Sequence, residues 1–198
     1  ITEISTDFVT VNEYNIGEKI LALLSRTGTF FKTDMAGACF FDEAAGELSC
    51  NRLWFSDEKM EKQNRLRLLS SAEYPWWVDL VKNHEVVHIA DTDKIPKCKE
   101  EGSRLLPIMK CRSLLCIPVA GEEVMGFLLF IVAGNPRTWP DEQINLLKVL
   151  GNMLADAKLK VEAEKEIKYL AYYDSMTGLP NRKLFKDRLT SAVLSAER

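Results

Sequence analysis

Two strongly apolar runs separated by a short polar segment restrict the possible folds most. Residues 113–119 read SLLCIPV, and residues 124–133 read VMGFLLFIVA. The intervening Ala120-Gly121-Glu122-Glu123 predicts a tight hairpin between two strands. Because both runs are apolar almost throughout, we expect central strands that are covered on both faces of a sheet. Pro118 has no N–H to donate, so we expect it near a strand end or a bulge.

The remaining patterns predict helices around a larger sheet. Apolar residues at helical spacing predict a helix over residues 9–25, and the charged residues 57–70 also favour a helix. Pro75 can open a further short helix. Strands are expected at residues 37–41, Glu47–Phe55 and 86–90, and the first two of them form a hairpin. Residues 91–110 are predicted as a loop because they contain Pro96, Gly102 and Pro107. Together, these strands and helices predict an α/β fold of the α+β type.

A long stretch without proline, residues 141–173, predicts a helix on the order of 50 Å long. In its first part the apolar residues step by three and four: Leu147, Leu150, Leu154, Ala157 and Val161. We expect the part up to Leu154 to pack on the chain's own sheet. Beyond Ala157 the apolar residues form only a narrow strip on the helix, with charged residues around it. Ala163, Ile167 and Leu170 keep the same spacing but in a shifted phase. That pattern predicts a parallel two-helix contact in a homodimer.

The composition excludes several classes of function. The chain has 198 residues, of which 46% are hydrophobic and 28% charged, a balance typical of soluble globular proteins. The net charge of −3 and the lack of a basic block argue against nucleic acid as a partner. No apolar run approaches the ~18 residues of a membrane span, and the first residues show no signal-peptide pattern, although sequence upstream of Ile1 could contain either. We therefore expect a cytoplasmic protein without membrane contact in this chain. Because the chain begins with Ile1 and not with Met, we also expect the natural protein to contain residues before Ile1.

The cysteines and histidines do not form a recognisable metal motif. The five cysteines are scattered without a Cys-x-x-Cys pair, so we expect reduced cysteines, as is usual in the cytoplasm. His84 and His88 are four residues apart, a spacing that places two ligands together on a helix. Because residues 86–90 are predicted as a strand, a structural histidine is favoured, and no metal site is expected.

Residues from about 9 to 157 resemble a GAF domain, a sensory α/β module, in the order and spacing of several diffuse marks. These marks are Pro75-Trp76, His88-Ile89-Ala90-Asp91, the run from Arg112 to Val119, Gly126, and Trp139 before the long helix. The resemblance implies an antiparallel sheet with helices on both faces. It also implies a cavity for a small molecule between the sheet and residues 91–110.

Residues 174–182, DSMTGLPNR, come after the long helix and predict a turn that leads into a new helix. Gly178 supplies a permissive backbone, and Leu179 precedes a proline and is therefore disfavoured in a helix. Asn181 is a good N-cap for the short helix after it. Asp174 and Arg182 carry opposite charges and could pair across the turn.

The same nine residues resemble the entry motif of GGDEF domains, the diguanylate cyclases, with Met176 in place of the usual leucine. The matching positions, in a structural role, are Asp174, Thr177, Gly178, Leu179, Asn181 and Arg182. The resemblance implies a sensor domain over residues 1–157, a helical linker over 158–173 and the start of a GGDEF domain over 174–198. The family's catalytic residues lie farther along, so none is expected in this chain.

For the whole protein, the resemblance implies the condensation of two GTP molecules to cyclic di-GMP in a dimer, with Mg²⁺ or Mn²⁺. A small-molecule signal in the GAF cavity would control this reaction through the linker helix. The 198-residue chain alone is expected to be inactive and to hold no cofactor. Because the motif is also common where a GGDEF domain precedes an EAL phosphodiesterase domain, that arrangement remains an alternative.

The ligand itself is not indicated by the sequence. Candidate ligand contacts are Phe41, Trp54, His88, Cys98, Met109 and Cys111. The cyclic-nucleotide signature of GAF domains, Asn-Lys-x-Phe-x-Asp-Glu, is absent. A bilin is disfavoured because Lys99 and Arg112, not histidine, come directly after Cys98 and Cys111. The other alternative is a thiol enzyme, similar to GAF proteins that reduce free methionine sulfoxide, which needs an accessible thiol of low pKa.

Overall fold

The computed structural model describes residues 10–42, 45–63, 68–70, 77–95 and 111–196. The chain forms two compact units, Ile1–Ala157 and Lys158–Arg198. The first unit contains a sheet with its covering helices. The second contains the end of the long helix, a turn and a final helix.

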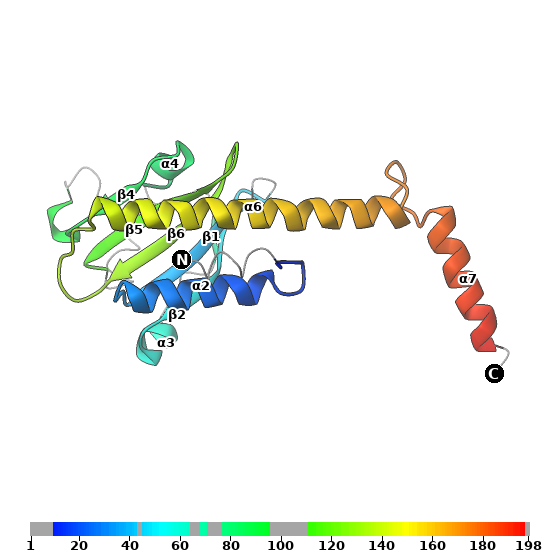
Figure 1. Ribbon diagram of the computed structural model, residues 1–198, viewed down its shortest axis with the longest axis horizontal. Coiled ribbons are helices and arrows are strands. Elements are labelled where there is room, and N and C mark those ends of the chain that lie inside the picture. Colours follow the sequence, from blue (N-terminus) through cyan, green and yellow to red (C-terminus); the bar gives the residue numbers. More distant parts are fainter. Residues whose placement is uncertain (1–9, 43–44, 64–67, 71–76, 96–110, 197–198) are drawn as a thin grey trace. The chain divides into compact units, whose positions relative to one another are not determined.

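Within the described residues, the sheet of the first unit has six strands in the order β3-β2-β1-β6-β5-β4, and all neighbouring strands are antiparallel (Figure 1). The strands are β1 (Met35–Asp42), β2 (Glu47–Phe55), β3 (Leu68–Ser70), β4 (Val87–Ile89), β5 (Ser113–Ala120) and β6 (Val124–Val132). The apolar hairpin β5–β6 lies in the interior of the sheet and is buried on both faces. The predicted α+β fold with its central hairpin is therefore confirmed.

Pro118 occupies the position that its chemistry requires. It pairs with Phe127 close to the end of β5, and the register shifts between the next two residues, Val119 and Ala120. A proline cannot contribute an N–H to the ladder, so strand ends and bulges are where it is tolerated. The prediction for Pro118 is confirmed.

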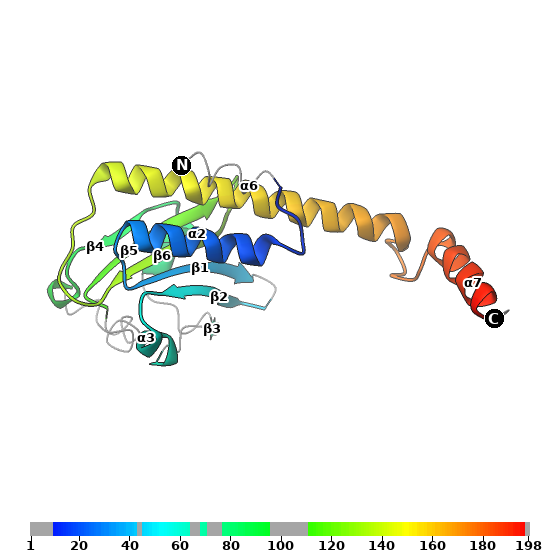
Figure 2. The same cartoon turned by 60° about the horizontal axis from the view of Figure 1, so that its bottom comes forward.

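Two helices cover one face of this sheet, α2 (Ile16–Phe30) and the first part of α6 (Asp141–Tyr172) (Figure 2). A Cβ on Gly28 of α2 would lie 2.2 Å from the ring of Trp54 in β2. A Cβ on Gly151 of α6 would lie 2.7 Å from the carbonyl oxygen of Pro118 in β5. The apolar series Leu147, Leu150 and Leu154 is buried, as predicted.

The opposite face of the sheet is covered by the short helix α4 (Trp77–Lys82). Its residues Trp77, Val78 and Val81 are buried in one apolar cluster with residues from β1, β2, β4, β5 and β6. The described part of the first unit has two further short elements, α3 (Glu58–Gln63) after β2 and the 3-10 turn η2 (Thr92–Lys94) after β4. We refer to the two sides of the sheet as the α2/α6 face and the α4 face.

Three expectations need correction. The first helix begins at Ile16, not at residue 9, because the side-chain oxygen of Asn12 accepts the N–H groups of Tyr14 and Asn15 in a turn. Leu68–Ser70 is a strand that pairs with β2, so pairing across the sheet overrides local helix preference there. Cys39 and Cys50 are joined by a disulfide bond, not reduced, because strand pairing brings them together.

The second unit begins inside α6 and ends with α7 (Arg182–Ala196). Between the helices lies a turn that includes an isolated bridge between Tyr173 and Pro180. In the parts of the chain that the structure describes, no helix is both long and apolar enough to cross a bilayer.

Candidate functional site

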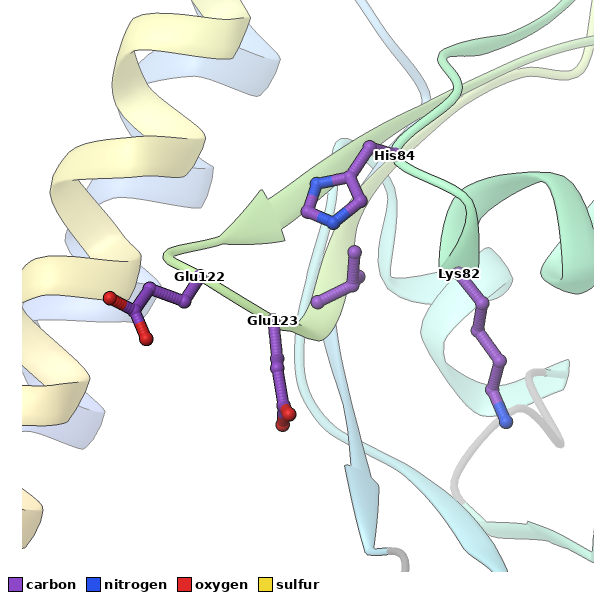
Figure 3. Close-up of a pocket in the computed structure, with 5 residues that line it drawn as sticks. Lys82, His84, Glu122 and Glu123 are labelled. Atoms are coloured by element: carbon purple, nitrogen blue, oxygen red, sulfur yellow. The ribbon is translucent and has the colours of Figure 1, made fainter.

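A pocket of about 270 Å³ opens at the end of the β5–β6 hairpin (Figure 3). It is lined by Lys82 at the end of α4, by His84 just after it, and by Glu122, Glu123 and Val124 of the hairpin. In Figure 3 the carboxylates of Glu122 and Glu123 point in different directions, and Lys82 lies on the other side of the pocket. The lining therefore combines both signs of charge with one apolar side chain.

Local backbone geometry positions these side chains. His84 has a left-handed backbone (φ 61°) and donates its N–H to the carbonyl oxygen of Val81 (2.9 Å), which ends α4. On the other side, Gly121 donates its N–H to the carbonyl oxygen of Glu123 (3.1 Å) and keeps the hairpin tight. The pocket thus lies between two turns whose shapes are set by hydrogen bonds.

Phe41 is the predicted ligand contact that the structure brings close to this pocket. The ammonium group of Lys82 lies 4.8 Å from the centre of the Phe41 ring. Phe41 also packs against Phe127 with ring centres 6.0 Å apart. Both Phe41 and Val124 are partly buried against the apolar cluster of the α4 face. A small molecule in the pocket would meet a cation, an imidazole, carboxylates and one apolar side chain, which suits a polar ligand with an apolar part.

Trp54 lies on the other side of the sheet. In the β1–β2 register it pairs with Ala36, and its ring packs on Gly28 of α2. Trp54 is therefore part of the α2/α6 face, whereas Phe41 belongs to the α4 face. The structure does not bring these two predicted contacts together.

His88 links β4 to the start of α6. It pairs in register with Leu115 of β5, and its Nε2 accepts the backbone N–H of Trp139 (3.2 Å). His84 sits in the turn after α4, so the two histidines occupy different elements.

Cys111 is buried immediately before β5, and its thiol donates to the carbonyl oxygen of Ser113 (3.3 Å). Burial raises the pKa of Cys111 to about 12. Burial and the neighbouring Cys111 raise the pKa of the Cys116 thiol as well. Both cysteines are thus neutral thiols at physiological pH, which makes them poor nucleophiles.

Hydrogen bonds and ion pairs hold the backbone around Cys111. The hydroxyl of Thr92 donates to the carbonyl oxygen of Cys111 (2.8 Å). Arg112 pairs with Asp91 (3.3 Å) and with Asp93. These contacts tie η2 to the start of β5. The remaining two predicted contacts, Cys98 and Met109, lie outside the described residues.

Sequence reasoning did not select the pocket residues Lys82, His84, Glu122 and Glu123 as a group. In the sequence, only the adjacent Glu122 and Glu123 of the predicted hairpin could have indicated a site there. Exposed glutamates are common in turns, so this pair is not specific. Only the pairing of β5 with β6 and the packing of α4 place them near Lys82. Among the residues that the structure describes, no group of three or more His, Cys, Asp or Glu side chains could hold a metal ion.

In the second unit, Asp174 organises the turn after α6. One of its carboxylate oxygens accepts the N–H of Met176 (3.1 Å) and both the N–H and the hydroxyl of Thr177 (2.9 Å each). The hydrogen bonds from Thr177 lower the pKa of Asp174. Gly178 has φ +68°, the left-handed conformation for which glycine was predicted. No ion pair joins Asp174 to Arg182 within the described part of the second unit, so that expected pairing is not observed.

Asn181 is the N-cap of α7, as predicted. Its side-chain oxygen accepts the N–H of Leu184 (3.1 Å), and its side-chain amide donates to the carbonyl oxygen of Ala171 (2.9 Å). Its backbone N–H donates to the carbonyl oxygen of Tyr172 (2.8 Å). The polar residues of the DSMTGLPNR stretch thus build a turn whose hydrogen bonds are largely satisfied internally.

Comparison with protein families gives one match that covers most of the chain. The family model described as "GAF domain" matches residues 15–157. This range begins next to α2, includes the whole sheet and ends inside α6.

Among curated proteins, the uncharacterized protein Rv1354c of Mycobacterium tuberculosis is 34% identical over 90 residues. A protein of Mycobacterium bovis, Mb1389c, matches with the same identity and length. The alignment covers 45% of this chain but only 14% of each relative, so the chain spans a small part of these proteins.

Solved structures share the fold at low sequence identity. The phycoerythrobilin-bound GAF domain of a cyanobacterial phytochrome superposes with a TM-score of 0.68 at 16% identity, covering 83% of this chain and 95% of that one. The GAF domain of a phosphoenolpyruvate-protein phosphotransferase from Coxiella burnetii gives a TM-score of 0.64 at 16% identity, covering 83% and 94%.

Proposed function

The chain belongs to the GAF domain family. We propose that it is the sensory module of a diguanylate cyclase. In this proposal the GAF unit binds a small-molecule signal. The signal is relayed through α6 to a GGDEF domain that begins at Asp174 and makes cyclic di-GMP from two GTP molecules with Mg²⁺ or Mn²⁺. The 198-residue chain itself is the regulatory part and carries no catalytic residue.

The observation that carries the proposal is the turn after α6. Its sequence resembles the GGDEF entry motif, and the side chains of Asp174, Thr177 and Asn181 each make a hydrogen bond within the turn or to its flanking helices. Motif residues with such structural roles support a fixed connection between a helix and a domain after it. A flexible linker would need none of these contacts.

The second unit also supports the proposed homodimer. In its part of α6, Ile167 and Leu170 are 67% and 50% exposed, and Leu159 is 46% exposed. Charged residues flank this apolar series, and Lys158 pairs with Glu162 one turn away. Two such helices side by side would bury the apolar residues and leave the charges in water. A cyclase that joins two GTP molecules needs two subunits, so a dimeric linker suits the proposed reaction.

On the sensory side, the pocket between α4 and the β5–β6 hairpin is the candidate for ligand contact in the described residues, with Phe41 beside it. In this proposal the cyclase uses GTP and acts in the cytoplasm. A ligand could change activity only by binding more tightly to one arrangement of the linker than to another.

Two alternatives differ in how far the structure bears on them. A GAF-type thiol enzyme would need a reactive thiol, and the raised pKa of Cys111 disfavours it. A GGDEF domain followed by an EAL phosphodiesterase domain would share every feature described above. The products of the full-length protein separate that arrangement from a cyclase.

The test is to incubate the full-length protein with GTP and Mg²⁺ and to separate the products by chromatography, with the 198-residue chain as the control. Cyclic di-GMP from the full-length protein and none from the control is the expected result. Hydrolysis of added cyclic di-GMP without any synthesis would favour the phosphodiesterase. If the full-length protein shows neither synthesis nor hydrolysis of cyclic di-GMP, the proposal is overturned.

A further inference from the structure

The Cys39–Cys50 disulfide lies at an irregular point of the sheet. In the β1–β2 ladder Ala38 pairs with Arg52, and the next regular pair joins Phe40 to Ser49. One residue of β1, Cys39, therefore faces two residues of β2, Cys50 and Asn51. This arrangement is a β-bulge in β2, and the disulfide joins the two strands where the ladder of hydrogen bonds is interrupted.

The disulfide is enclosed by the α4 face of the core. Cys39 is fully buried and Cys50 is 1% exposed, and both belong to the apolar cluster of that face. The same cluster contains the two unbonded thiols Cys111 and Cys116. Because burial keeps these thiols protonated, they do not readily attack the disulfide. Its reduction therefore depends on an external thiol that reaches it when the sheet opens locally.

The position of β2 in the sheet favours such local opening. In the described residues, β2 pairs on one side with β1 and on the other with the three-residue strand β3. Segments with few stabilising contacts open locally far more often than the whole domain unfolds. The disulfide thus joins a strand near the edge of the sheet to the central strand β1.

A change in β2 would also reach α2. The ring of Trp54 packs on Gly28, and the guanidinium group of Arg52 lies against Gly17. Both side chains come from the part of β2 that lies after the bulge. If β2 loosens or shifts after the bulge, these two contacts with α2 must change with it.

We propose that the Cys39–Cys50 disulfide is a redox switch that holds the bulged pairing of β2 with β1, and that its reduction loosens β2 and the helix α2 packed on it. Two electrons from a dithiol or from two glutathione molecules convert the disulfide into two thiols, and the donor becomes a disulfide. Disulfides in the cytoplasm are typically transient and redox-sensing, so the biological role rests on the proposed location. The structural effect can be tested without any cyclase activity.

The first measurement is differential alkylation of the purified chain followed by peptide mapping. Without reductant, Cys39 and Cys50 should be protected even after denaturation, whereas Cys111 and Cys116 should be labelled. In glutathione buffer at the cytosolic poise, Cys39 and Cys50 should become labelled. A disulfide that is absent after aerobic purification, or that resists this buffer, would overturn the switch.

The second measurement is hydrogen–deuterium exchange with and without dithiothreitol. Reduction should speed exchange of the β2 and α2 amides by about ten-fold, with little change in β5. The variant Cys50→Ala should exchange fast in both conditions. The control Cys116→Ala removes another buried cysteine of the same cluster and should keep the response to reductant. Equal exchange in oxidised and reduced wild-type protein would contradict the proposal.

Discussion

The side-chain amide of Asn181 donates a hydrogen bond to the carbonyl oxygen of Ala171 (2.9 Å), while its side-chain oxygen accepts the N–H of Leu184 (3.1 Å). One side chain thereby caps the start of α7 and binds the last turn of α6. Carbonyl groups near a helix C-terminus lack partners within the helix, so this contact satisfies one of them.

Replacing Asn181 by alanine should loosen both helix ends. An N-cap contributes about 1 kcal/mol, so the amides at the start of α7 should exchange about five-fold faster. Hydrogen exchange measured residue by residue by NMR checks this. The matched control is Lys186→Ala, a change on the exposed surface of α7, which should leave exchange unchanged. Equal exchange in the Asn181 variant and the wild type would show that the cap does not hold the turn.

Acid should open the turn around Asp174. Its pKa is lowered, chiefly by the hydrogen bonds from Thr177, so the folded turn favours the carboxylate. A depressed pKa means that this stabilisation is present above the ordinary value of 3.8 and is lost as the pH falls through the lower folded value. The amide NMR signals of Met176 and Thr177 should therefore move together in that range. In Asp174→Asn, which cannot ionise, the same signals should show no such titration.

Alanine at position 28 should destabilise the GAF unit. The new Cβ would come 2.2 Å from the ring of Trp54, so the indole must move. Overpacking of this kind costs about 1–3 kcal/mol, which corresponds to a fall in Tm of roughly 2–10 °C for a protein of this size. Tryptophan fluorescence reports this unit because every tryptophan precedes residue 158. Gly134→Ala is the control, since a Cβ there meets nothing within 4 Å, and its Tm should stay close to that of the wild type.

The buried thiol of Cys111 should make the protein sensitive to alkali. Its pKa is raised to about 12 from 9.0, so above pH 9 the unfolded chain ionises while the folded chain does not. Stability should therefore be complete below pH 9 and fall as the pH rises toward about 12. Urea titrations at several alkaline pH values measure the loss, and Cys111→Ala should reduce it. Rapid labelling of Cys111 by iodoacetamide in the folded protein at pH 8 would contradict the assignment.

Replacing Ile167 by glutamine should weaken the proposed dimer. Ile167 is 67% exposed in the single chain, and in a paired helix it would lose this contact with water. We expect the dissociation constant from sedimentation to rise by about ten-fold, the effect of losing most of one buried aliphatic side chain. Lys165→Gln lies outside the apolar series and should change it little. A chain that is monomeric at all concentrations would refute the dimer rather than the GAF assignment.

Much of the fold could be predicted because its strongest elements are locally encoded. The β5–β6 hairpin needs only two apolar runs and a short polar turn, and the long helix needs only a lack of proline. Gly178 and Asn181 were likewise identified from backbone chemistry alone. Each of these predictions depends on residues that are close in sequence.

Apart from the start of the first helix, the errors concern features that depend on distant pairing. Leu68–Ser70 becomes a strand because β2 offers it an edge, and Cys39 meets Cys50 through the bulge in β2. Phe41 and Trp54 are both candidate ligand contacts, yet the sheet separates them, because residue alternation assigns them to opposite faces. The pocket at Lys82 and Glu123 depends on tertiary packing in the same way.

The central claim is that α6 transmits the state of the GAF unit to a cyclase, and insertions in α6 of the full-length protein test it most directly. A seven-residue insertion after Glu162 preserves the coiled-coil phase, whereas a four-residue insertion rotates the C-terminal part of the helix relative to the GAF unit. The account predicts that the initial rate of cyclic di-GMP formation from GTP stays within about two-fold for the first and changes by at least about ten-fold for the second. Equal rates for both insertions, or no cyclic di-GMP from the uninserted protein, would contradict it.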